Sequence, residues 1–415
     1  MTLNDLKREK LGICVSGGLD SKTITKKLVD IGIDVVCFVA DLAQADEKDI
    51  GDIVKKMAPC GAETIIVDLK KEMAAACFEL IKAQGMYDGG YWNSTGLARA
   101  VTVRGIIPEM KKQGCTVLVH GATGRGNDQM RFERYANVLA PELKVYAPWR
   151  DPVLLVEFPG RRQMADYLNK AGIEAFPGGK KRYSTDANLA GLSYEAEDLE
   201  SLETACTIVQ PQMGVWPEDA PDKKEMFEVR FEKGAAVKIN GRNVSPLEAM
   251  QQANVIGGRN GIGLKNALEN RIVGTKSRGV YESPGMELLG QCLLSVYQAT
   301  MDKRTTDLFR YLSALIAQQV YDGRYYDPAT TAAQAAIDVM TASASGNVKV
   351  ALYKGNILFQ GLSDCPGSIY NETDSSMEAS KGLNPTSSQG FAEIQSVEAK
   401  ALARAGQIRS SGVKK

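Results

Sequence analysis

The stretch from Ile13 to Ser21, Ile-Cys-Val-Ser-Gly-Gly-Leu-Asp-Ser, constrains the fold of this chain more than any other. An apolar run ends in a Ser-Gly-Gly turn, and a helical pattern follows from Asp20. Two adjacent glycines let a ligand approach the backbone closely, and the start of a helix offers free N–H groups and a partial positive charge. Two interpretations follow, a phosphate-binding turn or a plain strand–helix connection.

The first third of the chain favours the phosphate-binding interpretation, because continuous apolar strands alternate there with amphipathic helices. This pattern is typical of a parallel sheet covered on both faces. Ligands of such sheets lie beyond the carboxyl ends of the strands, so Ser16, Ala40 and His120 should border one crevice. We predict strands over residues 11–15, 34–40, 64–69 and 116–120, and helices over 21–31, 46–59, 70–84 and 95–113.

The pattern weakens after about residue 170. The fold class that we predict is α/β: a parallel-sheet nucleotide-binding domain over 1–170, an α+β domain over 171–362 and a polar tail over 363–415. The tail has too little apolar content to fold alone and is either mobile or docked on another subunit. Within the second domain we predict loops over 178–193 and 257–263, hairpins over 226–239 and 347–360, helices over 246–254 and 284–315, and a solvated acidic helix face over 195–203.

Composition excludes several classes of protein. Fifty basic and fifty acidic residues cancel, so nucleic acid is not an expected partner. No apolar run reaches the roughly 18–20 residues that span a membrane, and the charged N-terminus does not resemble a secretory signal. Eight scattered cysteines without a C-x-x-C pair, and a single histidine, argue against a zinc site. Reduced thiols in the cytoplasm explain the cysteines best.

A second motif follows the predicted strand that ends at His120. Glycines are frequent over residues 121–126, and Asn127 and Arg131 then share one face of a helix. An amide and a guanidinium suit a carboxylate, while Asp128 suits an ammonium group or a magnesium ion. The motif indicates either an amino acid bound beside a nucleotide or a capped surface helix. His120 itself is more typical of a packed residue than of a catalytic one.

Four further polar stretches have two interpretations each. Ser94 or Thr95 either caps the helix that follows or belongs to a recognition loop. Residues 184–186, 193–195 and 269–282 are either surface or part of a site. A Ser/His/Asp triad would have to use the single histidine, and nothing in the sequence resembles one.

Taken together, these motifs resemble the argininosuccinate synthase family, a branch of the PP-loop ATP pyrophosphatases with an adenine nucleotide α-hydrolase-like fold. Residues 16–21 match the PP-loop Ser-Gly-Gly-x-Asp-Ser/Thr, and 121–133 resemble Gly-x-Thr-x-Lys-Gly-Asn-Asp-x-x-Arg-Phe-Glu, with Arg125 in the lysine place. Further similarity is found at residues 147–150, 193–196, 269–271, 276–285 and 368–372.

The resemblance implies an AMP-forming ligation of citrulline and aspartate through a citrullyl-adenylate, as in arginine biosynthesis or the urea cycle. It implies ATP with Mg²⁺ and a homotetramer whose tail forms an intersubunit arm. The implied ATP contacts are Cys14, Val15, Ser16, Gly17, Gly18, Leu19, Asp20, Ser21, Ala40, Gly121, Thr123, Asp128 and Asp186. The implied citrulline contacts are Tyr91, Thr95, Gly96, Asn127, Arg131, Ser184, Ser193, Glu195, Glu269 and Tyr281, and the aspartate contacts are Thr123, Asn127 and Asp128. No nucleophilic side chain is required.

The chain departs from the family pattern close to these ligands. Lys22 follows Ser21 where the family has serine, and we predict that it points to solvent rather than to a phosphate. Asp41 and Ala43 replace the common Asn and Gly, and Gly96 replaces a side chain that often lies near citrulline. The alternatives are therefore a PP-loop ligase with another amine or ureido substrate and a non-catalytic nucleotide-binding paralogue.

Overall fold

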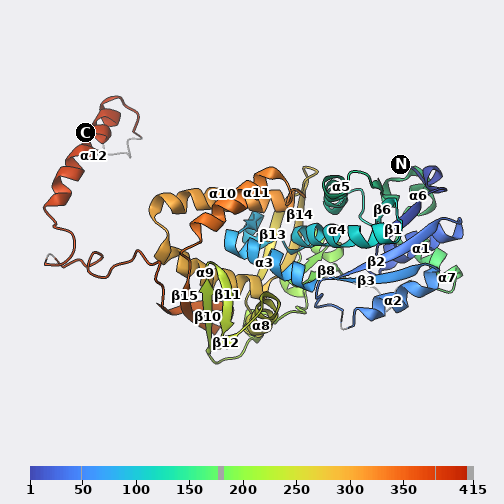
Figure 1. Cartoon of the computed structure of the whole chain (residues 1–415), viewed down its shortest axis with the longest axis horizontal. Helices are drawn as coiled ribbons and strands as arrows, with labels where there is room; N and C mark the ends of the chain where they lie inside the picture. The colour runs from blue at the N-terminus through green and yellow to red at the C-terminus, as the bar shows by residue number, and fades with distance from the viewer. Residues whose placement is uncertain (48, 176–181, 379, 409–415) are drawn as a thin grey trace. The chain divides into compact units, whose positions relative to one another are not determined.

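The computed structural model describes residues 1–47, 49–175, 182–378 and 380–408. The chain divides into two compact units, Met1–Gly367 and Ser368–Lys415. All the elements discussed as a site belong to the first unit (Figure 1).

A five-stranded parallel sheet forms the amino-terminal part of the first unit, with strand order β3-β2-β1-β6-β7. The α/β class and the four predicted strands are confirmed, whereas β7 was not predicted. Strand β2 pairs with one edge of β1, and β6 pairs with its other edge. The strand order therefore reverses at β1, and a ligand-binding crevice is expected at the carboxyl end of that strand. The strands are β1 (Lys10–Cys14), β2 (Asp34–Asp41), β3 (Glu63–Asp68), β6 (Val117–His120) and β7 (Lys144–Tyr146).

Helices cover both faces of this sheet, and β2 shows why its sequence is continuously apolar. Cys37 and Val39 pack into a core with α1 and α7, while Val36 and Phe38 pack on the opposite face with α3 and α4. Both faces are therefore buried, as expected for a parallel sheet. The helices of this part are α1 (Leu19–Asp30), α2 (Gly51–Met57), α3 (Lys70–Ala83), α4 (Ser94–Lys112), α5 (Asp128–Leu139), α6 (Pro152–Glu157) and α7 (Arg161–Lys170).

Helix α2 begins at Gly51, so the predicted start at Asp46 is wrong. The Asp49 carboxylate accepts a hydrogen bond from the Gly51 N–H at 2.8 Å, and Ala45 and Asp46 form a turn. Asp46 and Glu47, the acidic residues that suggested a first helical turn, therefore lie before the helix and outside it.

A four-stranded antiparallel sheet of order β13-β14-β9-β8 adjoins α4, and the predicted loop over 178–193 is wrong in its second half. Residues 178–181 lie outside the described part; residues 184–195 form a hairpin. Its first strand reads Ser-Thr-Asp-Ala-Asn, which lacks the alternation of apolar residues from which strands are predicted. The strands are β8 (Ser184–Asn188), β9 (Gly191–Glu195), β13 (Leu264–Asn270) and β14 (Lys276–Glu282), and a separate two-stranded ribbon pairs β4 (Met86–Tyr87) with β5 (Tyr91–Trp92).

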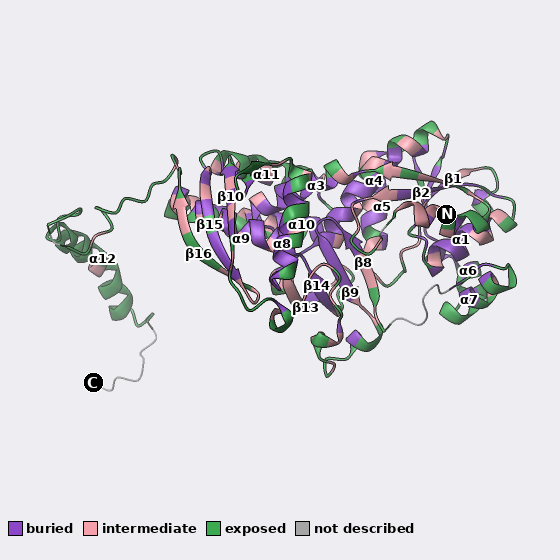
Figure 2. Ribbon diagram, turned by 90° about the horizontal axis from the view of Figure 1, so that it is seen from below, coloured by how far each residue is buried: buried purple, intermediate pink, exposed green. Residues whose placement is uncertain are grey.

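The third sheet is antiparallel with order β12-β11-β10-β15-β16, and it confirms both predicted hairpins. Burial falls from its interior strands to the outer strand β16, which is exposed along much of its length (Figure 2). The strands are β10 (Glu225–Glu232), β11 (Ala235–Ile239), β12 (Arg242–Asn243), β15 (Gly346–Tyr353) and β16 (Asn356–Ser363).

Two helical predictions in this part need correction. Helix α8 (Pro246–Arg259) runs through Gly257 and Gly258, which we predicted as a loop, although the predicted close approach to another backbone is present. A Cβ on Gly258 would lie 2.0 Å from the Met213 carbonyl oxygen, so contact with a neighbouring chain segment requires this glycine. The predicted helix over 284–315 is two helices, α9 (Pro284–Thr300) and α10 (Lys303–Tyr321), because Asp302 caps the second one through the Arg304 N–H at 2.9 Å.

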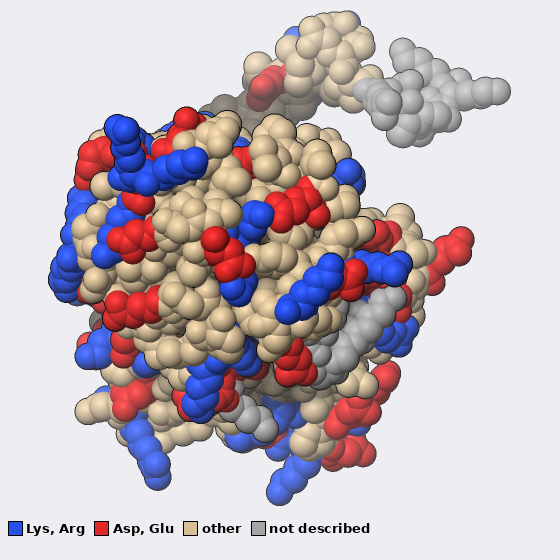
Figure 3. Space-filling model, turned by 90° about the vertical axis from the view of Figure 1, so that its right-hand side faces the viewer, with Lys and Arg blue, Asp and Glu red and all other residues tan. Residues whose placement is uncertain are grey.

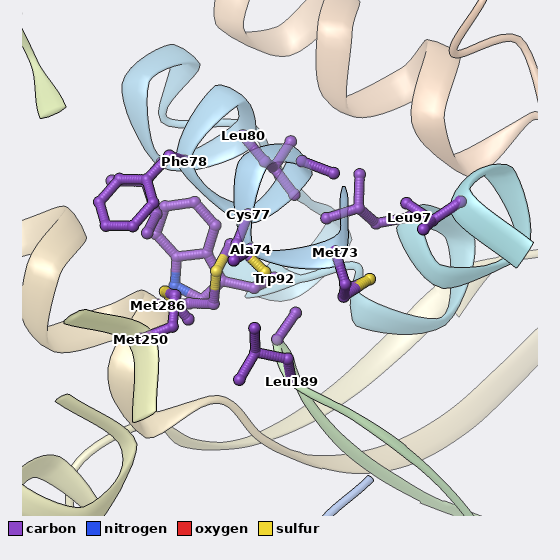
Figure 4. Close-up of a cluster of buried hydrophobic side chains, with 14 of the residues drawn as sticks. Met73, Ala74, Cys77, Phe78, Leu80, Trp92, Leu97, Leu189, Met250 and Met286 are labelled. Carbon is purple, nitrogen blue, oxygen red and sulfur yellow. The ribbon is translucent and has the colours of Figure 1, made fainter. Parts of the chain in front are cut away.

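The main core joins the first third of the chain to the second half. Helix α3 packs against α8, α9 and α10, and Figure 4 shows Met73, Cys77 and Phe78 of α3 beside Met250 of α8 and Met286 of α9. The predicted boundary near residue 170 therefore separates segments that share a core. Helix α11 (Pro328–Met340) completes this side of the unit.

The surface of the first unit mixes charges of both signs. On the face drawn in Figure 3, Lys and Arg are interspersed with Asp and Glu, and neither sign dominates. The acidic run after Glu195 forms one short 3-10 turn, Glu197–Glu200, instead of the predicted helix face, because Leu199 is buried beneath it. Among the described residues, no helix is long and apolar enough to cross a membrane.

The second unit contains one long helix, α12 (Ser387–Arg404), none of whose residues is buried. Phe391 and Ile394, three positions apart, are 68% and 71% exposed. The large apolar side chains of this 18-residue helix are therefore not covered within its own unit among the described residues.

Candidate active site

A cavity of about 1030 Å³ opens at the carboxyl ends of β1, β2 and β6. Phe38, Arg99 and Arg161 also line it. The crevice predicted from the strand order is thus present. Of the predicted site residues, the cavity is lined by Cys14, Val15, Ser16, Gly17, Gly18, Leu19, Asp20, Ser21, Ala40, Gly121, Asp128, Ser184 and Asp186.

The Ser-Gly-Gly turn combines a glycine at positive φ with the uncapped start of α1. Gly17 has a φ of +72°, a conformation that side-chain-bearing residues rarely adopt. Gly18 precedes α1 and supplies no side-chain cap, so the first-turn N–H groups of α1 stay available to an anion. The Ser16 N–H donates to the Ser21 Oγ at 3.1 Å, which fixes the turn against the helix.

Two charged residues of α1 differ in their surroundings. Burial raises the pKa of Asp20, and the positive charge of Arg161 opposes this rise. Lys22 is only 3% exposed, and its Nζ donates to the Glu174 carbonyl oxygen at 2.7 Å, so the prediction that it points to solvent is wrong. A long side chain on the inner face of α1 reaches a carbonyl that a serine cannot reach.

A chain of four charged side chains leads away from the cavity, and we call it the Asp186–Arg131 chain. Arg99 pairs with Asp186 and donates through Nε to Asp128 at 3.0 Å. Asp128 also accepts from Arg131 at 2.9 Å. Burial opposes ionisation of Asp128, but the two guanidinium groups outweigh it and hold its pKa below the usual value.

Beyond Arg131, and connected to it through Tyr321, lies a buried carboxylate, Glu269, which is surrounded by hydroxyl groups. Tyr91 donates to it, as do Tyr321 at 2.8 Å and Ser277 at 3.2 Å. The Tyr281 hydroxyl lies 3.3 Å from the same carboxylate, and its ring stacks on Tyr91 at 3.9 Å between centroids. Four hydroxyl donors stabilise a carboxylate that is 4% exposed.

Tyr321 connects this cluster to α5. Its hydroxyl accepts from the Asn127 Nδ2 at 2.8 Å, and its ring lies under the Arg131 guanidinium at 4.9 Å. The Arg131 Nε donates to the Tyr321 carbonyl oxygen at 2.9 Å. The predicted residues Asn127, Arg131, Tyr91, Glu269 and Tyr281 are therefore brought together through a residue that was not predicted.

The antiparallel sheet presents the remaining predicted residues on one face. In its register Ser184 lies opposite Glu195, Asp186 opposite Ser193, and Ser193 opposite Tyr281. Residues directly opposite one another in a sheet project from the same side. Ser184 and Asp186 line the cavity, so this face extends from the cavity toward Tyr281.

Glu195 stands on that face among other acids. Burial raises its pKa to about 7, and the charges of Glu269, Asp128 and Asp186 add to the rise, while Arg271 opposes it. A carboxyl that changes its charge near neutral pH is typical of a functional site, although ion networks also produce such shifts.

The first turn of α4 differs from the prediction. Asn93, rather than Ser94 or Thr95, caps the helix by accepting from the Gly96 N–H at 2.8 Å. The Gly96 N–H is therefore already used within the protein. The Thr95 hydroxyl is buried and has no hydrogen-bond partner among the described residues.

Two predicted positions lie apart from these groups. Thr123 is exposed on the loop after β6 and does not line the cavity, whereas its neighbour Gly121 does. His120 is fully buried and stacks on Phe132 at 5.3 Å, and burial lowers its pKa to about 4. It is a packed, neutral residue at neutral pH.

The segment after β2 holds its shape through side chains. The Asp41 carboxylate accepts from the Ala43 N–H at 3.1 Å and pairs with Lys70 at 2.6 Å, while Gln44 donates to the Ala40 carbonyl oxygen at 2.8 Å. Ala43 has a φ of +55°, so this alanine adopts a glycine-like conformation.

Sequence reasoning missed Arg99, Tyr321 and Ser277. Arg99 lies in a segment that attracted attention for its hydroxyl groups, and its spacing from Asp128 and Asp186 carries no local signal. Tyr321 is at the end of a helix 190 residues from Arg131, with which it forms a contact. Only the resemblance to a family could have singled out such positions.

A parallel sheet with a Ser-Gly-Gly turn at its order reversal, facing a sheet of polar side chains, defines a nucleotide-binding α/β enzyme. Residues 10–174 match the model of the arginosuccinate synthase N-terminal HUP domain, and residues 183–402 match that of the arginosuccinate synthase C-terminal domain. The chain belongs to the argininosuccinate synthase family, whose members are ATP-dependent ligases.

Relatives named argininosuccinate synthase come from distant organisms. One from Rhodopirellula baltica is 38% identical, covering 94% of this chain and 97% of the relative. One from Thermotoga maritima is 36% identical, with 95% and 97% covered. The chloroplastic enzyme of Arabidopsis thaliana is 35% identical, with 97% of this chain and 81% of the relative covered.

Proposed function

We propose that this chain joins citrulline to aspartate, consuming ATP and releasing AMP and pyrophosphate. Family membership along nearly the whole chain supports this. The observation that carries the proposal for this chain is the Asp186–Arg131 chain, which links the nucleotide cavity to the Glu269 cluster. Domain 1–170 would bind the nucleotide, domain 171–362 would complete the amino-acid site together with residues of the first domain, and the tail 363–415 would form an arm.

The backbone N–H groups of the Gly17–Gly18 turn suit the phosphates, with Ser16 and Ser21 beside them and Ala40 near the base. Gly121, Thr123, Asp128 and Asp186 complete the proposed ATP contacts. Mg²⁺ prefers one or two carboxylates together with phosphates, and Asp20 is a cavity-lining carboxyl that fits this role. The metal would neutralise phosphate charge there. Among the described residues, no group of three or more His, Cys, Asp or Glu forms a protein-only metal site.

The amino acids would lie between the cavity and Glu269. Citrulline would contact the Tyr91–Glu269–Tyr281 group and the sheet face of Ser184, Ser193 and Glu195, with Thr95, Gly96, Asn127 and Arg131 at its borders. Aspartate would meet Thr123, Asn127 and Asp128.

The chemistry needs positioning more than covalent catalysis. The ureido oxygen bonds to the α-phosphorus and the bond to the pyrophosphate oxygen breaks. The aspartate amine then bonds to the ureido carbon and loses a proton, and the carbon–oxygen bond breaks to release AMP. In-line placement and stabilisation of phosphate charge account for such a reaction without a nucleophilic side chain.

The test uses citrulline labelled with ¹⁸O in its ureido group. The label should appear in AMP, and formation of the carbon–nitrogen product should require ATP, citrulline and aspartate together. Label-free AMP, or turnover only with another amine or ureido compound, would favour a sister enzyme. Absence of any turnover by a folded, ATP-binding protein would favour a non-catalytic paralogue.

We further propose a homotetramer in the cytoplasm, with α12 docking on a neighbouring subunit. The exposed apolar side of α12, including Phe391, Ile394 and Val397, supports this, because exposed apolar patches mark interaction surfaces. Buried thiols such as Cys37, Cys77 and Cys292 suit a reducing compartment.

The assembly is tested by sedimentation of the whole chain and of a Phe391→Glu, Ile394→Glu variant. A tetramer that dissociates in the variant supports the arm. A monomer in the unaltered protein, or a tetramer unchanged by the substitutions, contradicts it. Glu393→Gln, on the polar side of the same helix, is the matched control.

A further inference from the structure

The first turn of α4 contains hydrogen-bond donors that the protein itself does not use. Asn93 is 2% exposed, and its Nδ2 has no hydrogen-bond partner among the described residues. The Thr95 Oγ1 is likewise buried without a partner. Buried polar groups are nearly always paired, so two unpaired ones only two positions apart need a physical reason.

The orientation of the Asn93 amide is fixed by its cap. Its Oδ1 accepts from the Gly96 N–H, so the amide nitrogen must point away from that bond. The Nδ2 lies 2.5 Å from where a Cβ of residue 96 would be. Asn93 thus occupies the space that a side chain at position 96 would need, and the glycine is what allows this placement.

All the unused groups of this turn can donate. They are the amide of Asn93, the hydroxyl of Thr95 and the N–H groups of Ser94 and Thr95, the first two residues of a 19-residue helix, which have no acceptor within the helix. The start of a helix also carries partial positive charge. This combination fits an anionic acceptor, and a carboxylate supplies two oxygens for it.

The position of the turn relates it to the proposed amino-acid site. Thr95, Arg99, Thr102 and Ile106 follow helical spacing on one side of α4, and the last three line the cavity. Two residues before Asn93, Tyr91 donates to Glu269. A carboxylate-binding turn and a buried carboxylate at neighbouring positions suit the two charges of an α-amino acid.

We propose that Asn93 is a specificity-determining residue that donates from Nδ2 to the α-carboxylate of the ureido amino acid. The inference rests on the proposed function and deepens it, because it states which residue recognises that carboxylate. Asn93 takes part in binding, while the bonds that form and break lie elsewhere.

The first experiment compares Asn93→Asp and Asn93→Ser with the unaltered enzyme. Both replacements still cap a helix, so the melting temperature should change little. Only asparagine adds an N–H donor to the capping oxygen. The KM for citrulline should rise about 30-fold or more in N93D, where two carboxylates face each other, and about fivefold in N93S, while the KM for ATP changes less than threefold.

The second measurement separates recognition from a structural role. The probe is the primary amine that has the ureido group and chain of citrulline but lacks the α-carboxylate. It should bind the unaltered enzyme more weakly than citrulline does. The ratio of citrulline affinity to that of this amine, measured by calorimetry, should fall at least tenfold in N93S. Loss of the helix cap alone would weaken the binding of both compounds equally and leave the ratio of affinities unchanged.

Gly96→Ala gives an independent test, because its Cβ would displace the Asn93 amide. It should lower the same ratio with Asn93 still present. A ratio that stays within threefold in both N93S and G96A overturns the inference. Failure of the unaltered enzyme to bind citrulline at all would instead overturn the proposed function, so the two failures are distinguishable.

Discussion

The two ends of the candidate site are built in different ways. The phosphate end is one continuous segment, Cys14 to Ser21, whose backbone turns into α1 and whose shape depends on Gly17. The Glu269 end gathers Tyr91, Ser277 and Tyr321 from segments up to 230 residues apart. A backbone site is robust to most side-chain changes, whereas a side-chain network depends on every member.

The difference is also electrostatic. The turn offers N–H groups that need no counter-charge within the protein. The Asp186–Arg131 chain contains two carboxylates and two guanidinium groups that compensate one another in a buried setting. Removing one member of this chain leaves a buried charge without its partner, and an unpaired buried charge strongly lowers the stability of the protein.

The largest expected effect is therefore from Asp128→Asn. This change leaves Arg99 with Asp186 alone and Arg131 without a carboxylate, and it should cost about 3–5 kcal/mol of unfolding free energy. Urea denaturation measures it. Asp186→Asn is the matched control, since Arg99 keeps Asp128, and its cost should be about 1 kcal/mol. Equal costs for the two variants would mean that Asp128 has no central role in the network.

The next effect is a dependence of protein stability on pH, caused by Glu195 on the sheet face of the site. The pKa of Glu195 is about 7 in the folded protein and near 4.5 when unfolded. Below pH 4.5 both states hold the proton. Between pH 4.5 and 7 only the unfolded chain releases it, so stability falls as pH rises, and above pH 7 the loss stays constant.

Glu195→Gln removes this loss. The stability difference between variant and unaltered protein should grow from pH 4.5 to pH 7 by about 2–3 kcal/mol, from 1.36 kcal/mol per pKa unit. Chemical denaturation at several pH values measures it. Glu203→Gln, an exposed position in the following segment, controls for the loss of one charge. A difference independent of pH would show that the neighbouring acids do not act on Glu195.

The same contrast determines what the sequence can predict. The turn at Gly17 and the strands β1, β2 and β6 follow from local patterns, and they were predicted correctly. The β8–β9 hairpin was missed, because its polar residues face the site and hide the alternation that marks a strand. Asn93 was overlooked as a cap since Ser94 and Thr95 are equally good candidates. Tyr321 and Arg99 act through distant contacts that leave no trace in neighbouring residues.

A smaller effect tests whether the turn acts through its backbone. Gly17→Ala and Gly32→Ala both put a side chain at positive φ, at +72° and +78°, and each should cost about 1–2 kcal/mol of stability. Only Gly17 lines the cavity. Equilibrium binding should show ATP affinity lowered more than tenfold in G17A and within twofold of normal in G32A. Equal ATP affinities of G17A and G32A would mean that the phosphates do not bind at the turn around Gly17.

The smallest effect concerns Ala43, whose φ of +55° is unfavourable for alanine. Ala43→Gly removes about 1–2 kcal/mol of backbone strain and adds about 0.5–1 kcal/mol of unfolded-state entropy, for a net gain near 0.5 kcal/mol. Lys233→Gly, at φ +49° in the β10–β11 turn, should gain as much and serves as control. Thermal unfolding measures both. ATP affinity should stay within twofold in A43G, because the Ala43 N–H is already bonded to Asp41. A loss of stability in A43G alone would mean that the Ala43 methyl group packs against the core strongly enough to outweigh the strain, and that this segment, unlike the turn at Gly17, depends on its side chains.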